Sequence, residues 1–443
     1  MSEDYSATAM ADEGVAKNVE YTGRYLVLLN EDDPKAGLEA LSSGAGVSVT
    51  DHVQAGDFAF AVQALEQGGT VVLDDLGIAV VEAVEGDQRL ALEATVASTP
   101  TLVGAEPERV LHACKKDTPA RPVEYFEGYL HGVADLVERV RGNGRVNAPL
   151  ARAVAGPQWS EAQATWGLQA ILATETALTG RGVGVAILDT GINEAHPDLA
   201  GRVRQSVSFV PGQAVDDGHG HGTHCAGTAC GPRNPATGPR YGVACEADIY
   251  VAKVLNNQGR GSDGQILNGI GWAMNQDGVR VISMSLGGAV ALGAGYSRIY
   301  ERAARRCLTR GKMIIAAAGN ESQRPMDLQP VGMPANCPSV LAVGAIAPDF
   351  TIAPFSCAGL NPNGGGVDLA GPGVDVLSTW RNGGYRRLNG TSMATPHVAG
   401  VAALLWEQNP NATAAQIVTL LRAGTRDLGL PASDAGRGLV QAP

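Results

Sequence analysis

Residues 183–193 are VGVAILDTGIN, an apolar run that ends in Asp189 and is followed at once by a glycine turn. Further runs rich in Val, Ile and Leu alternate with helical stretches, at 248–255, 279–286, 312–319 and 339–346. Strands without polar alternation are typical of a sheet that is covered on both faces. We therefore predict an α/β fold, a mostly parallel sheet with helices on both faces.

The residues that follow these strands are the first candidates for chemistry. In open parallel sheets, ligands bind at the carboxyl ends of the strands. Asp189 ends the first run, where an acid is often only a cap for the next turn. The segment DGHGHGTHCAGTA at 217–229 then places His219, His221 and His224 at the glycine-rich entry to a helix.

Two explanations fit these crowded histidines. Zinc is one, because neutral imidazoles at short spacing bind it well. The H-x-H-x-D-H pattern of one group of zinc hydrolases would need an acid at position 223, where this chain has Thr223. The other explanation is a general base that is oriented by a carboxylate, and it requires a nucleophile elsewhere.

The segment NGTSMATPHVAG at 389–400 provides that nucleophile as Ser392. A serine at the start of a helix is usually an N-cap. Its hydroxyl becomes a useful nucleophile only when a base takes its proton and a third group holds that base. Asp189, His221 and Ser392 offer these three roles in chain order, so we predict that they form a catalytic triad.

These residues resemble the subtilisin-like serine peptidases, or subtilases. The resemblance extends over roughly residues 160–430 and rests on five segments: AILDTGINEAHPDL around Asp189, HGTHCAGT around His221, SMSLGG at 283–288, AAAGN at 316–320 and GTSMATPHVAG around Ser392. It implies a serine endopeptidase in which His221 is the base and Asn320 donates to the oxyanion. With its internal cysteine, the segment HGTHCAGT is similar to that of the proteinase K branch of the family.

The resemblance also implies a substrate cleft. QGRG at 258–261 is similar to an edge strand that pairs with an extended substrate. Other segments are similar to the walls of the pocket for the residue before the cut, with Gly332 at its floor. The implied substrate-binding residues are Gly259, Gly261, Ser285, Leu286, Gly287, Gly288, Ala317, Gly319 and Gly332. We expect a monomer that acts broadly on proteins and peptides, with an apolar or aromatic residue preferred before the cut.

Two alternatives come from other classes of protein. Gly259, Gly261 and Gly264 form a G-x-G-x-x-G pattern between a strand and a helix, which is typical of dinucleotide-binding oxidoreductases. That turn starts late after the strand, and Asp263 would face the pyrophosphate. The other alternative is a catalytically inactive peptide-binding protein, although the chain retains every catalytic residue type.

The first part of the chain has the pattern of a small α+β unit, with strands at 24–29 and 70–83. It is similar to the inhibitory propeptides of the family, which implies an autoprocessed zymogen whose own propeptide is an intramolecular inhibitor. The processing cut is expected between Ala113 and about Ala162. The predicted units are a disordered N-terminal segment at 1–23, an inhibitor-like propeptide domain at 24–113, a linker with a helix at 114–157 and a catalytic domain at 158–443.

The resemblance implies calcium as a structural cofactor. Its ligands would be the backbone oxygens of Pro338 and Val340 with the carboxylate of Asp368, hard oxygen donors that suit this ion. The second ion site of the family is not reproduced in CGPRNPATGPRYG at 230–242.

The seven cysteines do not form the dense framework of small secreted domains. Cys225 resembles the free buried thiol of the proteinase K branch. The pairs Cys230 with Cys245 and Cys307 with Cys337 are candidates for disulfides in an oxidising compartment.

Charge and hydropathy exclude other classes. The formal charge of −12 is spread over 443 residues without a basic run, so we expect no nucleic-acid binding. No apolar stretch approaches the length of about 18 residues that a membrane span requires, so we expect a soluble protein. The first 23 residues carry acids where a secretion signal is basic and apolar, and the compartment therefore stays open.

Overall fold

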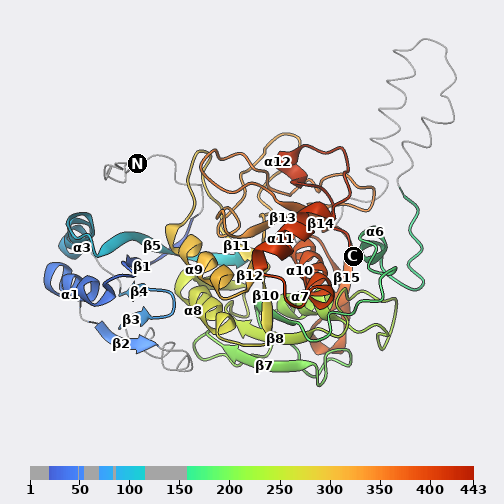
Figure 1. Cartoon of the computed structure of the whole chain (residues 1–443), viewed down its shortest axis with the longest axis horizontal. Helices are drawn as coiled ribbons and strands as arrows, with labels where there is room; N and C mark the ends of the chain where they lie inside the picture. The colour runs from blue at the N-terminus through green and yellow to red at the C-terminus, as the bar shows by residue number, and fades with distance from the viewer. Residues whose placement is uncertain (1–18, 48, 54–68, 83–85, 115–156) are drawn as a thin grey trace, which may run out of the picture.

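The computed structural model describes residues 19–47, 49–53, 69–82, 86–114 and 157–443, which are coloured in Figure 1. The predicted linker at 114–157, with its helix, lies almost entirely outside these residues. In the described part, no helix is long and apolar enough to cross a membrane.

A seven-stranded parallel sheet forms the centre of the larger domain, in the order β14-β13-β12-β10-β6-β8-β7. Its strands are β6 (Gly184–Asp189), β7 (Val203–Ser208), β8 (Asp248–Lys253), β10 (Val279–Met284), β12 (Met313–Ala317), β13 (Leu341–Ile346) and β14 (Leu369–Pro372). The predicted α/β class is confirmed. The five apolar runs are β6, β8, β10, β12 and β13, neighbours in one sheet.

Helices cover both faces of this sheet, which explains its unbroken apolar strands. In β6, Val185 and Ile187 pack in one core cluster, whereas Ala186 and Leu188 pack in another. The helices of the first face are α7 (His221–Cys230), α10 (Thr391–Gln408) and α11 (Ala414–Ala423), and those of the second face are α8 (Asp263–Met274) and α9 (Arg298–Thr309).

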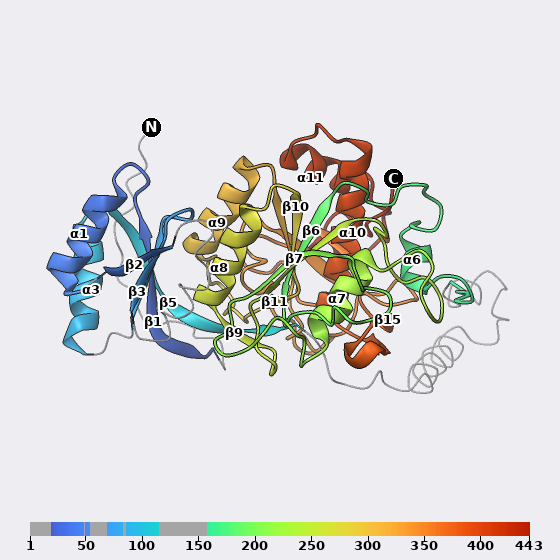
Figure 2. The same cartoon turned by 90° about the horizontal axis from the view of Figure 1, so that it is seen from below.

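A smaller α+β module precedes this domain and packs on α8 and α9, as Figure 2 shows. Its elements are β1 (Tyr21–Leu29), α1 (Pro34–Ala45), β2 (Val49–Val53), β3 (Thr70–Leu73), β4 (Ile78–Val81), α3 (Asp87–Ser98) and β5 (Leu102–Ala113). Strand β1 alternates between two cores. Val27 and Leu29 pack with α1 and α3, while Leu26 and Leu28 join the cluster of α8 and α9.

The module begins earlier than predicted. Strand β1 starts at Tyr21, inside the segment 1–23 that was predicted to be disordered, because Tyr21 pairs with Arg109 of β5. The predicted run at 70–83 is a hairpin of two strands, since Asp74–Gly77 turns the chain between β3 and β4.

Strand β5 leaves the module and enters the larger domain, as Figures 1 and 2 show. There it lies between β9 (Arg260–Ser262) and β11 (Leu286–Gly287), antiparallel to both. The end of β5 therefore completes a three-stranded patch at the carboxyl edge of the large sheet.

The remaining elements are short and lie at the periphery: α6 (Trp166–Ala170), β15 (Val376–Thr379), the 3-10 turn η1 (Arg381–Gly383), β16 (Tyr385–Leu388) and α12 (Ala432–Ala435). All seven cysteines are buried free thiols, so neither candidate disulfide is formed in this structure.

Candidate functional site

The predicted triad residues lie where their elements begin or end. Asp189 is the last residue of β6, His221 is the first residue of α7, and Ser392 is the second residue of α10. All three side chains are fully buried. The carboxyl end of a central strand therefore meets the amino ends of two helices that cover the same face of the sheet.

The structure joins His221 to Asp189 directly. Nδ1 of His221 lies 2.7 Å from Oδ1 of Asp189. Burial alone disfavours the imidazolium, but the nearby Asp189 carboxylate outweighs it and raises the pKa of His221 well above its ordinary value of 6.5. This contact fixes the orientation of the ring and turns Nε2 away from the acid, as a general base requires.

Ser392 lies beside the end of β5. Its Oγ donates to the carbonyl oxygen of Ser285 at 2.9 Å, and the backbone N–H of Cys114 donates to the same oxygen at 3.1 Å. Among the described residues, His221 Nε2 has no hydrogen-bond partner. Cys225 links the two halves of the triad, because its Sγ lies 3.9 Å from His221 Nδ1 and 3.7 Å from the carbonyl oxygen of Ser392.

Asn320 holds the carbonyl group of Cys114. Its Oδ1 accepts from the backbone N–H of Thr391 at 2.9 Å and from the Thr391 hydroxyl at 3.0 Å, which fixes the amide. Its Nδ2 then points at the Cys114 carbonyl oxygen and donates to it. The side chain is thus preset to donate where negative charge develops during attack on that carbonyl.

Most of the predicted cleft residues contact residues 110–114. The carbonyl oxygen of Gly259 accepts from the Ala113 N–H at 2.9 Å, Gly261 is opposite Leu111, and Leu286 and Gly287 are opposite Ala113 and His112. A side chain at Gly288 would come within 2.7 Å of Leu111. The backbone of β5 is therefore held on both sides, as an extended substrate would be.

The other predicted pocket residues lie in the adjoining segments. Ala317 ends β12. Gly319 donates to the Thr391 hydroxyl at 3.2 Å, and Gly332 donates to the carbonyl oxygen of Ala318 at 2.9 Å. A Cβ at Gly332 would lie 2.7 Å from the Gly288 carbonyl oxygen, so only glycine fits there.

Two residues that support the site were missed in the sequence. The buried carboxylate of Asp217 accepts from the Gly220 N–H at 2.7 Å and from the Thr223 N–H at 2.8 Å, just where α7 begins. Thr190 donates to Asp217 at 2.8 Å and accepts from the Gly222 N–H at 2.9 Å. The signal for Asp217 was an acid before a glycine-rich helix entry, a position that favours anions.

The other two histidines of the cluster do not join a common site with His221. Nε2 of His224 lies 3.0 Å from the carbonyl oxygens of both Val376 and Arg386, and burial lowers its pKa to about 3. The ring of His219 lies 6.1 Å from that of His221. The described donors that come together are Asp189, His221 and Cys225, within 4.8 Å of one another. Burial raises the pKa of the Cys225 thiol, which disfavours the thiolate that a metal needs.

The glycine pattern of the dinucleotide hypothesis serves another purpose. Gly261 is part of β9 and pairs with β5. The Gly264 N–H at the start of α8 donates to the buried carboxylate of Glu108 at 2.9 Å, and an added Cβ would lie 2.7 Å from that carboxylate. A side chain of β5 therefore occupies the helix end where a pyrophosphate would bind.

The only carboxylate predicted to hold calcium is already paired within the chain. Asp368 Oδ1 lies 2.5 Å from Nη2 of Arg422, and Asp368 Oδ2 accepts from the Ala342 N–H at 2.8 Å. The guanidinium of Arg422 already neutralises Asp368, which is the only carboxylate among the three predicted ligands. In this arrangement the donors do not fit calcium. A calcium ion at this site remains a prediction from the resemblance.

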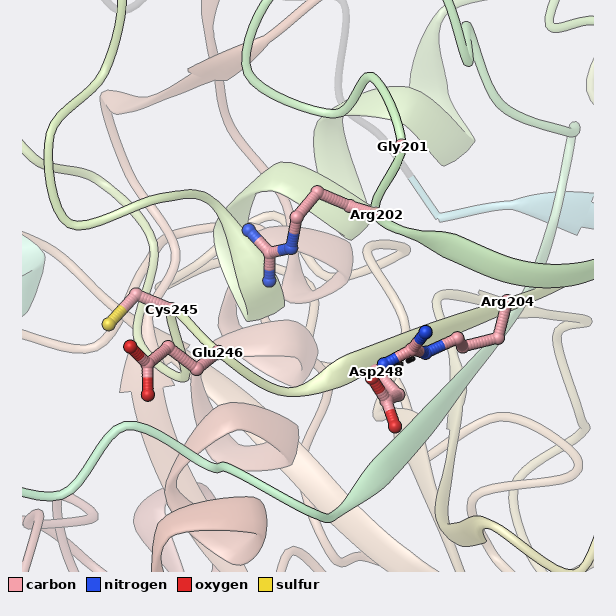
Figure 3. A pocket seen from close by; sticks show the side chains of 6 residues that line it. All are labelled: Gly201, Arg202, Arg204, Cys245, Glu246 and Asp248. Carbon is pink, nitrogen blue, oxygen red and sulfur yellow. Dashed lines mark hydrogen bonds and ion pairs between the residues drawn. The ribbon is translucent and has the colours of Figure 1, made fainter.

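A shallow pocket lies at the other end of the sheet, lined by Gly201, Arg202, Arg204, Cys245, Glu246 and Asp248 (Figure 3). Asp248 begins β8, whereas Lys253 at the end of that strand is opposite Asp189. Two of the charged side chains that line this pocket pair with each other, since Arg204 lies 2.8 Å from Asp248. This pocket is therefore separate from the triad.

An imidazole held by a buried carboxylate, a serine hydroxyl near the end of β5 and a fixed amide that donates to the Cys114 carbonyl oxygen are the groups that acyl transfer needs. The chain is a serine endopeptidase. A family model described as "Subtilase family" matches residues 180–439, more than half of the chain. The chain therefore belongs to the subtilase family.

Several subtilisins are similar to it. Subtilisin BL of Lederbergia lenta is 41% identical over 281 residues, which are 62% of this chain and 96% of the relative. M-protease of Shouchella clausii is 42% identical over 281 residues, which are 62% of this chain and 68% of the relative. Subtilisin E of Bacillus subtilis is 41% identical over 253 residues, 57% of this chain and 62% of the relative. These relatives do not confirm the predicted closeness to the proteinase K branch.

Replacing Asn320 by alanine should lower kcat by about 100- to 1000-fold, the range known for such a donor in subtilisin, a protein of this family. KM should change little, because the amide donates most strongly to charge that exists only in the transition state. Steady-state hydrolysis of a peptide substrate measures both constants. A rise in KM at unchanged kcat would show instead that Asn320 only binds the substrate.

Proposed function

We propose that this chain is made as an inactive precursor whose residues 21–114 inhibit the catalytic domain, and that its first substrate is its own bond between Cys114 and Lys115. The observation that carries the proposal is the position of Cys114. Its carbonyl oxygen accepts from Asn320, and its N–H shares the Ser285 carbonyl oxygen with the Ser392 hydroxyl. The carbonyl group of Cys114, the first residue after β5, is thus the one presented to Ser392.

In the proposed reaction, Ser392 Oγ attacks the carbonyl carbon of Cys114 while His221 Nε2 takes the hydroxyl proton. Asp189 stabilises the imidazolium, and Asn320 donates to the oxyanion. His221 then gives the proton to the Lys115 nitrogen as the carbon–nitrogen bond breaks. Water, deprotonated by His221, hydrolyses the ester between Ser392 and Cys114, which leaves a carboxylate on Cys114 and a regenerated hydroxyl.

One rearrangement must come before the attack. In the structure Ser392 Oγ donates to the Ser285 carbonyl oxygen, while His221 Nε2 is without a described partner. We infer that rotation of the Ser392 side chain exchanges the first hydrogen bond for one to Nε2. The resting precursor therefore holds the bond in place with the nucleophile not yet paired to its base.

The contact between module and catalytic domain supports the inhibitory role. The fully buried carboxylate of Glu108 accepts from the Gly264 N–H and lies 2.6 Å from Arg24 within the module. At the rim, Glu31 lies 2.9 Å from Arg302, and Asp75 lies 3.0 Å from Arg310. The cleft stays covered after the cut for as long as these contacts persist.

We propose an apolar or aromatic preference before the cut within a broad range of substrates. It is supported by the burial of the Cys114 thiol, since a Cβ at Gly287 would come within 3.4 Å of its Sγ. A panel of peptides that differ only at this position measures the preference through kcat/KM.

Mass spectrometry of the purified full chain tests the processing proposal. We expect an early fragment that ends at Cys114, and digestion of casein that follows its release. A first cut at any other bond would contradict the assignment of Cys114. A chain that digests casein while residues 21–114 remain covalently attached would contradict the inhibitory role.

The buried Asp263 predicts that inhibition by the module depends on pH. In the complex, its Oδ2 accepts from the Arg109 N–H at 2.8 Å and its Oδ1 from the Tyr300 hydroxyl at 2.8 Å. Burial raises the pKa of Asp263 to about 7. We expect the free enzyme to expose this acid, so that its pKa returns toward about 4. Between about pH 4 and about pH 7, Asp263 is therefore protonated in the complex and ionised in the free enzyme.

Inhibition by an added peptide of residues 1–114 should therefore weaken as pH rises from about 4 to 7, by up to about tenfold per pH unit. The variant Asp263→Asn should remove this dependence. The matched control is Glu20→Gln, which removes a charge that pairs with Arg260 at the exposed rim. Equal pH dependence in Asp263→Asn and wild type would contradict the role of Asp263.

A further inference from the structure

The loop after α7 contains a buried arginine that is bonded only to main-chain oxygens. The side chain of Arg240 is almost fully covered. Its Nε donates to the carbonyl oxygen of Gly242 at 3.1 Å, Nη1 to that of Ala173 at 3.2 Å, and Nη2 to that of Val243 at 2.9 Å. Among the described residues, no carboxylate forms an ion pair with it.

Such a ring of carbonyl oxygens is the usual environment of a hard metal cation. Here the positive charge belongs to the chain itself. The three oxygens come from two segments, one just after α6 and the other just after α7. Arg240 therefore connects the start of the catalytic domain to the loop of the catalytic helix, as a bridging ion would.

The carboxylate next to this loop is also satisfied by the chain. Asp198 is buried and accepts from the Tyr241 hydroxyl at 2.5 Å and from the Tyr385 hydroxyl at 2.8 Å. Its other oxygen accepts from the Ala236 N–H at 2.7 Å. Its hydrogen-bonding capacity is thus used without a cation.

A second guanidinium acts at the sheet edge. Arg422 of α11 lies 2.5 Å from Asp368, the carboxylate that was predicted to bind calcium. Asp368 precedes β14, and its second oxygen accepts from the Ala342 N–H in β13. The pair therefore joins α11 to two strands, the connection that an ion shared by these elements would make.

We propose that the guanidinium groups of Arg240 and Arg422 take the place of bound structural cations, so that the folded catalytic domain does not depend on calcium. Arg240 lies within a ring of carbonyl oxygens, and Arg422 neutralises the carboxylate of Asp368. The two sites involve different elements, so each contributes to stability independently.

Thermal unfolding of the full chain tests this inference, in a Ser392→Ala background that prevents self-digestion. With EDTA or with millimolar calcium chloride, the Tm of this protein should agree within about 2 °C. Arg422→Ala should create a calcium response, a rise of about 4 to 8 °C, because Asp368 is then free to bind the ion. The double variant Arg422→Ala with Asp368→Asn should lose that response.

Arg240→Met tests the ring of carbonyl oxygens. It keeps much of the apolar stem but removes the donors, and we expect Tm to fall by roughly 5 to 10 °C because three buried oxygens lose their partner. The matched control is Arg204→Met, since Arg204 is exposed and pairs with Asp248. If Arg240→Met gives no folded protein, Arg240→Lys keeps the charge without the planar fork and should still be less stable than the control.

Two results would overturn the inference. One is a Tm that EDTA lowers by many degrees in the Ser392→Ala protein and calcium restores, since the chain would then depend on the ion. The other is equal stability of the Arg240 and Arg204 variants. Both readouts are independent of peptidase activity, so they remain valid whatever the processing experiment gives.

Discussion

Alanine in place of Ser392 is expected to leave the full chain uncut and to lower peptide hydrolysis by about a million-fold, the size of this effect in subtilisin, a protein of the same family. The reason is that no other group can form the ester with Cys114. His221 and Asn320 retain their positions but have no nucleophile to serve. Mass spectrometry over days and hydrolysis of a peptide substrate measure the two effects.

The matched control is Ser283→Ala, because the Ser283 hydroxyl is buried in β10 without a described hydrogen-bond partner. This variant should process and digest at the wild-type rate. If purified Ser392→Ala still produced a fragment ending at Cys114, Ser392 would not be the nucleophile of this cut. Adding active wild-type enzyme to the variant distinguishes cutting between molecules from cutting within one.

Replacing Asp189 by asparagine is the second prediction, with an expected loss of about 10 000-fold in kcat, the loss caused by the equivalent change in another serine protease family. The amide keeps the shape of the side chain but favours the wrong tautomer of His221. The matched control Asp349→Asn alters an exposed acid that caps a turn at Thr351 and should leave kcat unchanged.

The pH profile of the Asp189 variant separates this role from a structural one. In the wild type, the Asp189 charge raises the pKa of His221, so activity is lost as pH falls through a value above 6.5. Without that charge, burial favours the neutral ring, and the acid limb should move to lower pH. If the acid limb of the Asp189→Asn variant stayed at the wild-type pH, a group other than His221 would control the pH profile of activity.

Local sequence was sufficient for the large sheet, and it was also the source of the triad prediction. The strands are apolar runs within one stretch of chain, and Asp189, His221 and Ser392 each occur in a short motif at the end of an element. Asn320 could be located for the same reason. Such features depend on neighbours in sequence, so they can be predicted without knowledge of packing.

Contacts between distant segments were harder to predict. The proposed cut site depends on β5 pairing with β9 and β11, far along the chain, because that pairing places Cys114 beside Asn320. The calcium prediction came from the resemblance, which groups Asp368 with Pro338 and Val340 and says nothing of α11. The guanidinium that occupies this carboxylate comes from α11, 54 residues away. Tertiary packing, which no local pattern encodes, decided both cases.

The pairing of β5 with strands on both sides also limits what the released enzyme can digest. In the proposed mature enzyme, which lacks the module, β9 and β11 would have open edges that an extended backbone of about five residues can fill, as residues 110–114 do here. Helices and compact loops cannot supply such a segment until they open. For a folded target, the cleavage rate is therefore set by the free energy of local unfolding, and the peptidase selects the weakest parts of other proteins.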